Sequence, residues 1–387
     1  MEKKNILLVG VGTDVEVALG ETLGPDHLAA ASDVPQARAL ARKGKPAAAV
    51  VRLREQPLPE SFDLVRELAA QGVPVLVLGA ARDPDSILAA MRAGAREYLA
   101  AGEESQIAPR MQALLEATGA LQLGQVTAVF PAKGGMGATS LAIHLAGALR
   151  RAGKRVCLLD LDLELGDVLS FLDLHGTYSL ADVAANTHRL DRDLLDASVP
   201  HHGSGVYVLS QCEKIAEGER LDPGKVVTVL RFLRQHYDHV IVDGLRDFGD
   251  IALAALDLAD RILLVVTQEV PAVRSAQRCA EYFRQLGFET KRVMLVVNRY
   301  HKGSPITREV VEETVGLPLA GLVGNDFQAL SRAVNRGVLL WEEAPRSTVV
   351  RDVEALAAQF LPPSPPESQG SFLKKIFASK VAAHGID

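Results

Sequence analysis

The sequence is poor in cysteine and in aromatic residues, and this limits its chemistry. Only 3 of its 387 residues are cysteine, and 5% are aromatic. Cys157, Cys212 and Cys279 are far apart and form neither a C-x-x-C pair nor any spacing typical of metal ligands. We therefore expect no cysteine-based metal site, and we interpret all three as small buried apolar residues in a reducing compartment.

The sequence also lacks an excess of positive charge and any long apolar run. Its formal net charge is −6, so any contact with nucleic acid or anionic lipid must be local. No apolar stretch approaches the roughly 18 residues that span a bilayer, and Met1–Lys4 leads directly into a short strand without a signal-peptide pattern. We expect a cytoplasmic protein, at most peripherally attached to a membrane.

The length and the alternation of apolar runs predict α/β architecture in two domains with a tail. Residues 1–120 form the first predicted domain, 125–361 the second, and 362–387 a proline-rich linker with a short amphipathic end. In the first domain we expect strands at 6–9, 47–51, 73–78 and 97–100, helices at 14–23, 62–71 and 83–93, and a closing helix and linker over 103–121. In the second we expect strands at 126–130, 156–160, 206–209, 239–243, 262–267 and 292–298. Each domain is predicted to be a doubly wound parallel sheet.

The stretch 125–150 is the strongest local signal. An apolar run, 126–130, breaks into the glycine-rich turn Lys133–Gly137, and Ala138-Thr139-Ser140 then opens an amphipathic helix. A strand, a glycine loop and a helix N-terminus together form a cradle for phosphate. The alternative is a tight connection without a ligand, but Lys-Gly-Gly-x-Gly followed by two hydroxyls favours a nucleotide site. The usual loop, G-x-x-x-x-G-K-[ST], has a lysine where this chain has Ala138.

Polar residues stand at the ends of three other predicted strands. Asp160 and Asp162 follow one strand, Asp243 ends a second, and Asn298-Arg299 follow a third. Because ligands of open α/β sheets bind at the carboxyl ends of strands, these acids are suited to a Mg²⁺ shell and an attacking water. The alternative is that they are ordinary strand-end or helix-capping residues, and Asn298 alone could be a turn residue.

The loop resembles the deviant Walker A loop of ParA/MinD ATPases, K-G-G-x-G-K-[ST]-[ST], with the second lysine lost. The resemblance implies ATP and Mg²⁺ as cofactors and a sandwich homodimer in which Lys133 reaches the partner's phosphates. It implies catalytic roles for Asp162, which orients water, and Lys133, and metal binding through Thr139, Asp160 and Asp243. The implied nucleotide-binding residues are Lys133, Gly134, Gly135, Met136, Gly137, Ala138, Thr139, Ser140, Asn298 (at the adenine) and Arg299. The run 163–167, Leu-Glu-Leu-Gly-Asp, departs from the D-P-Q-G of partition ATPases.

The first predicted domain resembles the receiver domains of response regulators, most clearly over 74–79 and 87–99. The residues that carry receiver chemistry are missing. Gly10-Val11-Gly12 stands where clustered carboxylates follow the first strand, Arg52 occupies the phosphoacceptor position, and Gly79 the position of the switch hydroxyl. The lysine after the last strand is also missing from 99–102. We therefore interpret this region as a pseudo-receiver for docking or dimerisation, with Asp14 capping a helix and Asp33 lying in a solvated loop.

Nearly the whole chain resembles the CpaE/TadZ proteins, ParA-like ATPases of tight-adherence (Flp) pilus assembly. The degenerate receiver, the Gly-Ala-Thr loop, the run Asp160-Leu-Asp-Leu163 and the segments 322–326, 333–337 and 344–347 carry this resemblance. It implies an ATP-binding, dimerising localisation scaffold with weak or absent hydrolysis, whose partners are pilus or secretion machinery or polar hub proteins. A polar location is implied, nucleic acid is not expected, and whether the protein is an enzyme stays open.

Three other interpretations remain. One is a DNA-partitioning or septum-placement ATPase. A partitioning enzyme would be expected to keep the loop lysine and to have a basic DNA-binding surface, so Ala138 and the net acidity argue against it. A signalling receiver with a nucleotide-dependent output is opposed by Arg52, and nitrogenase-type reductases need cysteines for a bridging cluster. The tail 371–377, Ser-Phe-Leu-Lys-Lys-Ile-Phe, resembles the membrane-targeting helix of MinD but is equally consistent with a disordered end.

Overall fold

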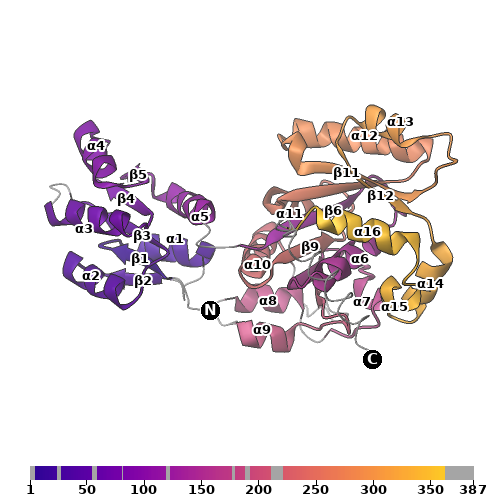
Figure 1. The fold of residues 1–387 in the computed structure, drawn as a ribbon, viewed down its shortest axis with the longest axis horizontal. Helices are drawn as coiled ribbons and strands as arrows, with labels where there is room; N and C mark the ends of the chain where they lie inside the picture. The colour runs from indigo at the N-terminus through magenta and orange to yellow at the C-terminus, as the bar shows by residue number, and fades with distance from the viewer. Residues whose placement is uncertain are drawn as a thin grey trace, which may run out of the picture.

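The computed structural model describes residues 5–23, 28–54, 59–80, 82–118, 123–176, 179–187, 192–210 and 221–361. The predicted linker and tail (362–387) and Cys212 lie outside these residues. Two separate parallel sheets make up the fold, five strands in the indigo-to-purple part of Figure 1 and seven in the rest. Within the described residues, no helix is both long and apolar enough to cross a membrane.

The N-terminal sheet has the strand order β2-β1-β3-β4-β5, with every neighbouring pair parallel. This is the order of flavodoxin-like doubly wound sheets. Alternate residues of β1 enter different apolar clusters, Leu7 and Val9 in one, Ile6 and Leu8 in the other, because helices cover both faces. Its elements are β1 (Ile6–Val9), α1 (Thr13–Leu23), β2 (Leu28–Ala31), α2 (Val34–Lys43), β3 (Ala48–Arg52), α3 (Pro59–Ala70), β4 (Val75–Gly79), α4 (Pro84–Ala93), β5 (Glu97–Ala100), the 3-10 turn η2 (Glu104–Gln106) and α5 (Ile107–Ala117).

Two elements of this sheet were not predicted from the sequence. The edge strand β2 reads Leu-Ala-Ala-Ala, and alanine has little preference for strands, so it carries no recognisable pattern. The helix α2 starts after Asp33, whose carboxylate accepts a hydrogen bond from the Gln36 N–H at 2.8 Å. The expectation of Asp33 as a loop carboxylate was therefore wrong, since Asp33 is a helix cap. The expected cap Asp14 is instead the second residue of α1.

The larger sheet has the order β12-β11-β10-β6-β9-β7-β8, again with all neighbours parallel. All six strands predicted from the sequence are present. The edge strand β12 was missed, because its two glycines hide its apolar pattern. The elements are β6 (Gln125–Pro131), α6 (Ala138–Arg151), β7 (Val156–Asp160), α7 (Val168–Phe171), α8 (Leu180–Asn186), α9 (Arg192–Ser198), β8 (Tyr207–Leu209), α10 (Pro223–His236), β9 (His239–Asp243), α11 (Asp250–Leu258), β10 (Arg261–Val266), α12 (Val270–Gln285), the 3-10 turn η3 (Thr290–Arg292), β11 (Val293–Tyr300), α13 (Arg308–Val315), β12 (Leu319–Gly324), α14 (Phe327–Asn335), α15 (Leu340–Glu343) and α16 (Thr348–Ala358).

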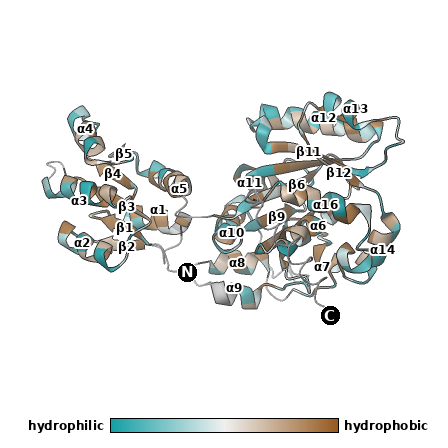
Figure 2. Ribbon diagram, viewed as in Figure 1, coloured by the Kyte–Doolittle hydropathy of each residue, from teal (hydrophilic) through white to brown (hydrophobic). Residues whose placement is uncertain are grey.

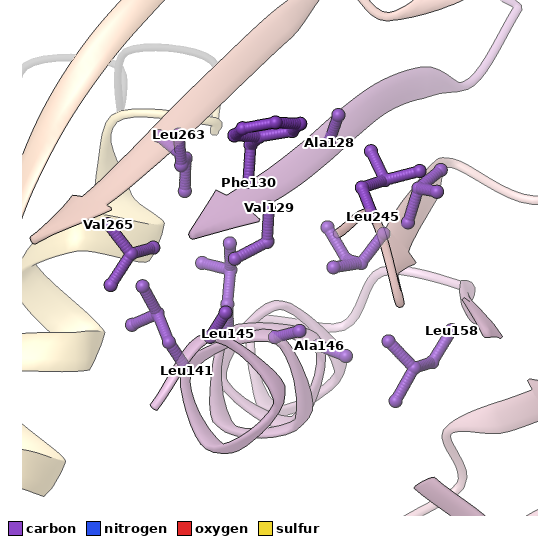
Figure 3. Close-up of a cluster of buried hydrophobic side chains, with 14 of the residues drawn as sticks. Ala128, Val129, Phe130, Leu141, Leu145, Ala146, Leu158, Leu245, Leu263 and Val265 are labelled. Carbon is purple, nitrogen blue, oxygen red and sulfur yellow. The ribbon is translucent and has the colours of Figure 1, made fainter. Parts of the chain in front are cut away.

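The helix α6 packs beneath the central strand β6. Its Leu141 and Leu145 are turned toward the sheet, whereas Phe130 projects from the other side of β6 (Figure 3). On that side Phe130 meets Phe283 of α12, with ring centroids 5.5 Å apart. The strands are the most hydrophobic segments of the ribbon and the helices carry polar outer surfaces (Figure 2). This packing fixes the start of α6 against the carboxyl ends of β6, β9 and β7.

Candidate nucleotide-binding site

The glycine loop between β6 and α6 has the backbone shape of an anion cradle. Gly135 and Gly137 have φ angles of 81° and 79°, a region that other residues rarely adopt. Gly137 immediately precedes α6 and has no side chain to cap it, so the first N–H groups of the helix remain available to a ligand. Gly134 and Gly135 border open space, because a Cβ on either would meet no atom within 4 Å.

Met136 of the loop is held from two neighbouring strands. The Asn298 Nδ2 donates to the Met136 carbonyl at 2.8 Å, and the Thr267 hydroxyl contacts the Met136 sulfur at 3.2 Å. A Cβ on Gly137 would lie 2.5 Å from the same Asn298 amide, so glycine is required there. Asn298, the residue expected to contact the adenine, thus already uses its amide N–H to bind the loop.

The two residues that set the charge of the loop differ sharply in environment. Lys133 is exposed at the start of the loop. Ala138, where the usual lysine stands, is 9% exposed and belongs to the apolar core. The loop itself therefore contributes one cation, at its outer end.

The acidic strand ends Asp160 and Asp243 lie side by side next to the loop. They occupy paired positions of the neighbouring parallel strands β7 and β9. The Asp243 carboxylate accepts a hydrogen bond from the Thr139 hydroxyl, which joins the end of β9 to the first turn of α6. Asp160 accepts from the Asp162 N–H at 3.0 Å through Oδ1, while its buried Oδ2 meets no donor among the described residues.

Burial and nearby negative charges raise the pKa of both carboxyl groups. Loss of hydration raises the pKa of Asp243 to about 7, with the Asp160 charge adding to the effect and the Thr139 hydrogen bond opposing it. Loss of hydration raises the pKa of Asp160 to about 6, and the Asp162 N–H opposes that. A bound cation would reverse these shifts, because it favours the ionised carboxylates.

Asp162 does not point freely into the site. Its Oδ2 forms an ion pair with the Arg246 guanidinium, and its Oδ1 accepts from the Leu165 N–H at 3.2 Å. Arg246 belongs to the loop 245–249 that follows β9. The predicted water-orienting carboxylate is thus held by a residue of the segment 245–250, which the resemblance to ParA/MinD ATPases makes the second switch but in which the sequence singled out no site residue.

A cavity of about 300 Å³ opens beside the loop, at the carboxyl ends of β11 and β12. It is mainly apolar, as pockets for planar ring ligands usually are. Gly137, Ser140, Asn298 and Arg299 line it, so predicted residues from the loop and from β11 are brought together there. Arg299 has a φ angle of 53°, an uncommon conformation for a residue other than glycine. Further lining comes from residues not assigned to the site from the sequence, among them His144, Phe171, Asn325, Asp326, Phe327 and Leu330.

His144 is a buried wall residue of this cavity and is held in its neutral form. Its Nε2 accepts from the Leu340 N–H at 3.2 Å, so Nδ1 carries the proton and donates to the Ser140 carbonyl at 2.7 Å. Burial lowers the pKa of His144 to about 4. The ring stacks on Trp341 at 5.7 Å and so connects α6 to α15. Its position four residues after Ser140, on one face of α6, is the sequence signal that could have identified it.

The residues present suit a magnesium nucleotide. Within the described ranges no group of three or more His, Cys, Asp and Glu side chains could hold a metal unaided. Magnesium characteristically takes one or two carboxylates together with phosphate oxygens and water. The unpaired Asp160 oxygen, the Asp243 carboxylate and the Thr139 hydroxyl meet that requirement beside an open loop.

Comparisons with known proteins agree with this geometry. Residues 127–340, more than half of the chain, match the family CbiA, the CobQ/CobB/MinD/ParA nucleotide binding domain. The chain belongs to this family. The septum site-determining protein MinD of Thermotoga maritima is 27% identical over 223 residues, which are 56% of this chain and 80% of that protein.

Two solved structures share the fold. The ParA family ATPase from Chlorobium tepidum TLS aligns with a TM-score of 0.57 and 24% identity, over 60% of this chain and 98% of its own. MinD from Pyrococcus horikoshii OT3, complexed with Mg-ADP, aligns with a TM-score of 0.52 and 20% identity, over 61% of this chain and 96% of its own. The seven-stranded sheet and its helices are therefore a P-loop domain of the ParA/MinD type.

Proposed function

We propose that this protein is an ATP-binding, dimerising localisation scaffold of the CpaE/TadZ type, which acts in Flp pilus assembly with weak or absent hydrolysis. The observation that carries the nucleotide part is the cavity that Gly137, Ser140 and Asn298 line directly beside the open glycine loop. Adenine would occupy this cavity, and the phosphates would receive the N–H groups of residues 134–140. The MinD of Pyrococcus horikoshii was solved with Mg-ADP, which supports this choice of ligand.

Magnesium would be held by Thr139, Asp160 and Asp243 and would supply charge neutralisation at the phosphates. The chain's own residues prepare this site: burial keeps the two carboxyl groups dry, and the Thr139 hydrogen bond keeps Asp243 against the loop. Asp162 would orient water only after leaving Arg246. These residues bind and position the nucleotide.

The substitution at Ala138 is the reason to propose assembly in preference to turnover. A lysine about 4 Å from a phosphate oxygen contributes about 4 kcal/mol gross at an effective dielectric constant near 20. Without this lysine, the positive charge beside the third phosphate of ATP must come from elsewhere. Lys133 is exposed, so it could reach the phosphates of a partner subunit across a nucleotide sandwich. We propose a homodimer that ATP stabilises and that turns over slowly.

We further propose that residues 1–120 are a receiver-like docking domain and 125–361 the nucleotide domain. The flavodoxin-like strand order supports the first assignment, and Arg52 at the end of β3 argues against phosphotransfer. Pilus or secretion machinery and polar hub proteins are the proposed partners. Peripheral membrane contact is proposed for the tail 371–387, and co-sedimentation with anionic liposomes, with and without that tail, tests it.

Size-exclusion chromatography with light scattering, combined with phosphate release, tests the main proposal. We expect a monomer without nucleotide, a dimer with Mg-ATP and little released phosphate, and we expect Lys133→Ala to lose the dimer. A monomer that hydrolyses ATP at ordinary rates, unaffected by Lys133→Ala, would contradict the proposal. The second candidate is a partitioning or site-placement ATPase, favoured by the similarity to MinD. A gel shift with DNA at low salt distinguishes a DNA-partitioning role, because such binding is electrostatic.

A further inference from the structure

The proposed site has many negative charges for a pocket that would bind a polyanion. Asp160, Asp162 and Asp243 lie together at the ends of β7 and β9. Lys133 is exposed at the outer end of the loop, and Ala138 brings no charge. The proposed Mg²⁺ would offset the carboxylates, but the third phosphate brings additional negative charge, so a triphosphate in this place gains from a further cation close to the carboxylates.

Arg246 is placed to be that cation. It stands three residues after Asp243, and its guanidinium is paired with the Asp162 carboxylate. Its side chain is 57% exposed whereas that of Asp162 is 11% exposed, so the guanidinium lies on the solvent side of the pair and has room to move. An arginine exchanges such a partner easily for phosphate, which it binds through two parallel N–H donors.

The loop that carries Arg246 is fixed at both ends. At one end, Gly244 has a φ angle of 81°, and a Cβ there would overlap the Asp162 backbone nitrogen. At the other end, the Phe248 ring lies 4.9 Å from the ring of Phe130 and 5.1 Å from that of Phe283. Phe130 belongs to β6, three residues before Lys133. The short segment between these two anchors therefore runs from the acidic strand ends to the strand that enters the glycine loop.

We propose that Arg246 supplies, within one chain, the positive charge that position 138 lacks, and thereby selects nucleoside triphosphates over diphosphates. This inference rests on the proposed nucleotide site. The loop N–H groups hold the phosphates that both ligands share, whereas the third phosphate extends toward the end of β9 and meets the guanidinium. Binding of that phosphate releases Asp162, so the carboxylate and the phosphate compete for one arginine.

Equilibrium binding of magnesium adenylyl imidodiphosphate, a non-hydrolysable triphosphate, and of Mg-ADP to the full chain tests this. We expect Arg246→Ala to bind the triphosphate about tenfold more weakly, which is about 1.4 kcal/mol, and ADP within about twofold of the unaltered chain. Arg246→Lys should retain part of the preference. Arg66→Ala is the matched control, because Arg66 is similarly exposed (64%) and paired with an aspartate, but lies in the other sheet. Thermal melts without nucleotide confirm that each variant is folded.

The Asp162→Asn background separates two possible roles of Arg246, binding the third phosphate and positioning the Asp162 carboxylate. If Arg246 binds phosphate, Arg246→Ala still weakens triphosphate binding about tenfold in that background, and Ala138→Lys restores affinity to the Arg246→Ala variant. The inference is overturned if the effect disappears with Asp162→Asn, or if Arg246→Ala weakens both nucleotides equally. If the unaltered chain binds neither nucleotide, the proposed function itself fails, which is a different result.

Discussion

The two sheets of this protein are built in the same way and differ at the edge formed by the carboxyl ends of their strands. Both are parallel and doubly wound, and both place the carboxyl ends of their central strands together. In the larger sheet those ends carry Asp160, Asp243 and Asn298 around an open glycine loop. In the smaller sheet they carry Arg52 and Gly79. The comparison teaches that the fold supplies a crevice, while a few strand-end residues decide whether it has chemistry.

Tyr98 adds a steric difference to the chemical difference between the carboxyl-end edges of the two sheets. A Cβ on Gly79 would overlap the Tyr98 hydroxyl, so the ring fills the place in which a larger side chain on β4 would stand. At the other sheet the corresponding region is kept open, since Gly134 and Gly135 have free space around them. One edge is closed by a side chain and the other is left for a ligand.

The largest expected effect comes from closing the open edge with Gly137→Ala. The φ angle of 79° and the Asn298 amide both oppose a side chain there, so we expect the free energy of unfolding to fall by about 2–4 kcal/mol. We also expect nucleotide binding to be lost. Gly153→Ala is the matched control, with a φ angle of 82° but no atom near its Cβ. It should lose only about 1–2 kcal/mol, the conformational part. Urea denaturation measures both, and equal losses would contradict the steric role of Asn298.

The next effect concerns the charge at the open edge and is a dependence on pH. The pKa of Asp243 is raised from 3.8 to about 7, so the folded state binds more protons than the unfolded state between those values. The free energy of unfolding therefore falls as pH rises through this window. Asp243→Asn removes that term, and without ligand we expect it to be more stable than the unaltered chain by about 2–3 kcal/mol at pH 8, with the difference vanishing near pH 4.

Urea denaturation at pH 4, 6 and 8 checks this, because taking the difference between the two proteins cancels the titrating groups that do not interact with Asp243. His144, whose pKa is lowered to about 4, contributes the opposite slope in both proteins. Stability gained on adding Mg-ATP should be lost in Asp243→Asn. A difference between the proteins that does not vary with pH would refute the assignment.

A smaller effect is expected from adding a side chain to the closed edge. Gly79→Ser forces the half-buried Tyr98 ring outward, and we expect a loss of about 1–2 kcal/mol in the free energy of unfolding. In a Tyr98→Ala background the same substitution should have almost no effect. A double-mutant cycle measures the coupling, and additive losses would show that the two residues do not compete for space.

The smallest effect is expected from restoring an acidic residue at the closed edge. Arg52→Asp recreates a phosphoacceptor type, but Val11 and Gly12 follow β1 in place of carboxylates that could hold magnesium. We expect no phosphoryl group to be incorporated from acetyl phosphate, as read by intact mass. A gain of one phosphoryl mass would show that the receiver chemistry is closer to functional than the strand ends indicate.

Much of the fold and part of the site could be predicted from the sequence because they are local. The apolar strands of the larger sheet are continuous runs, and the glycine loop is contiguous with the strand and helix that it joins. The elements that were missed, β2 and β12, lie at sheet edges and are rich in alanine or glycine, so they depend on pairing more than on their own pattern. The start of helix α2 is marked by the Asp33 cap, a single residue, which is a weaker signal in the sequence than a repeating hydrophobic pattern.

The sequence by itself determined the glycine loop, the acidic strand ends, the loss of lysine at Ala138 and the missing receiver residues. Only the tertiary structure decided which of these meet. The order β10-β6-β9-β7 places Asp243 beside both Thr139 and Asp160, and the cavity joins α6, β11, β12 and α14. The pairing of Arg246 with Asp162 likewise joins loops far apart in sequence. Such contacts depend on strand order and helix packing, which no local run of residues encodes.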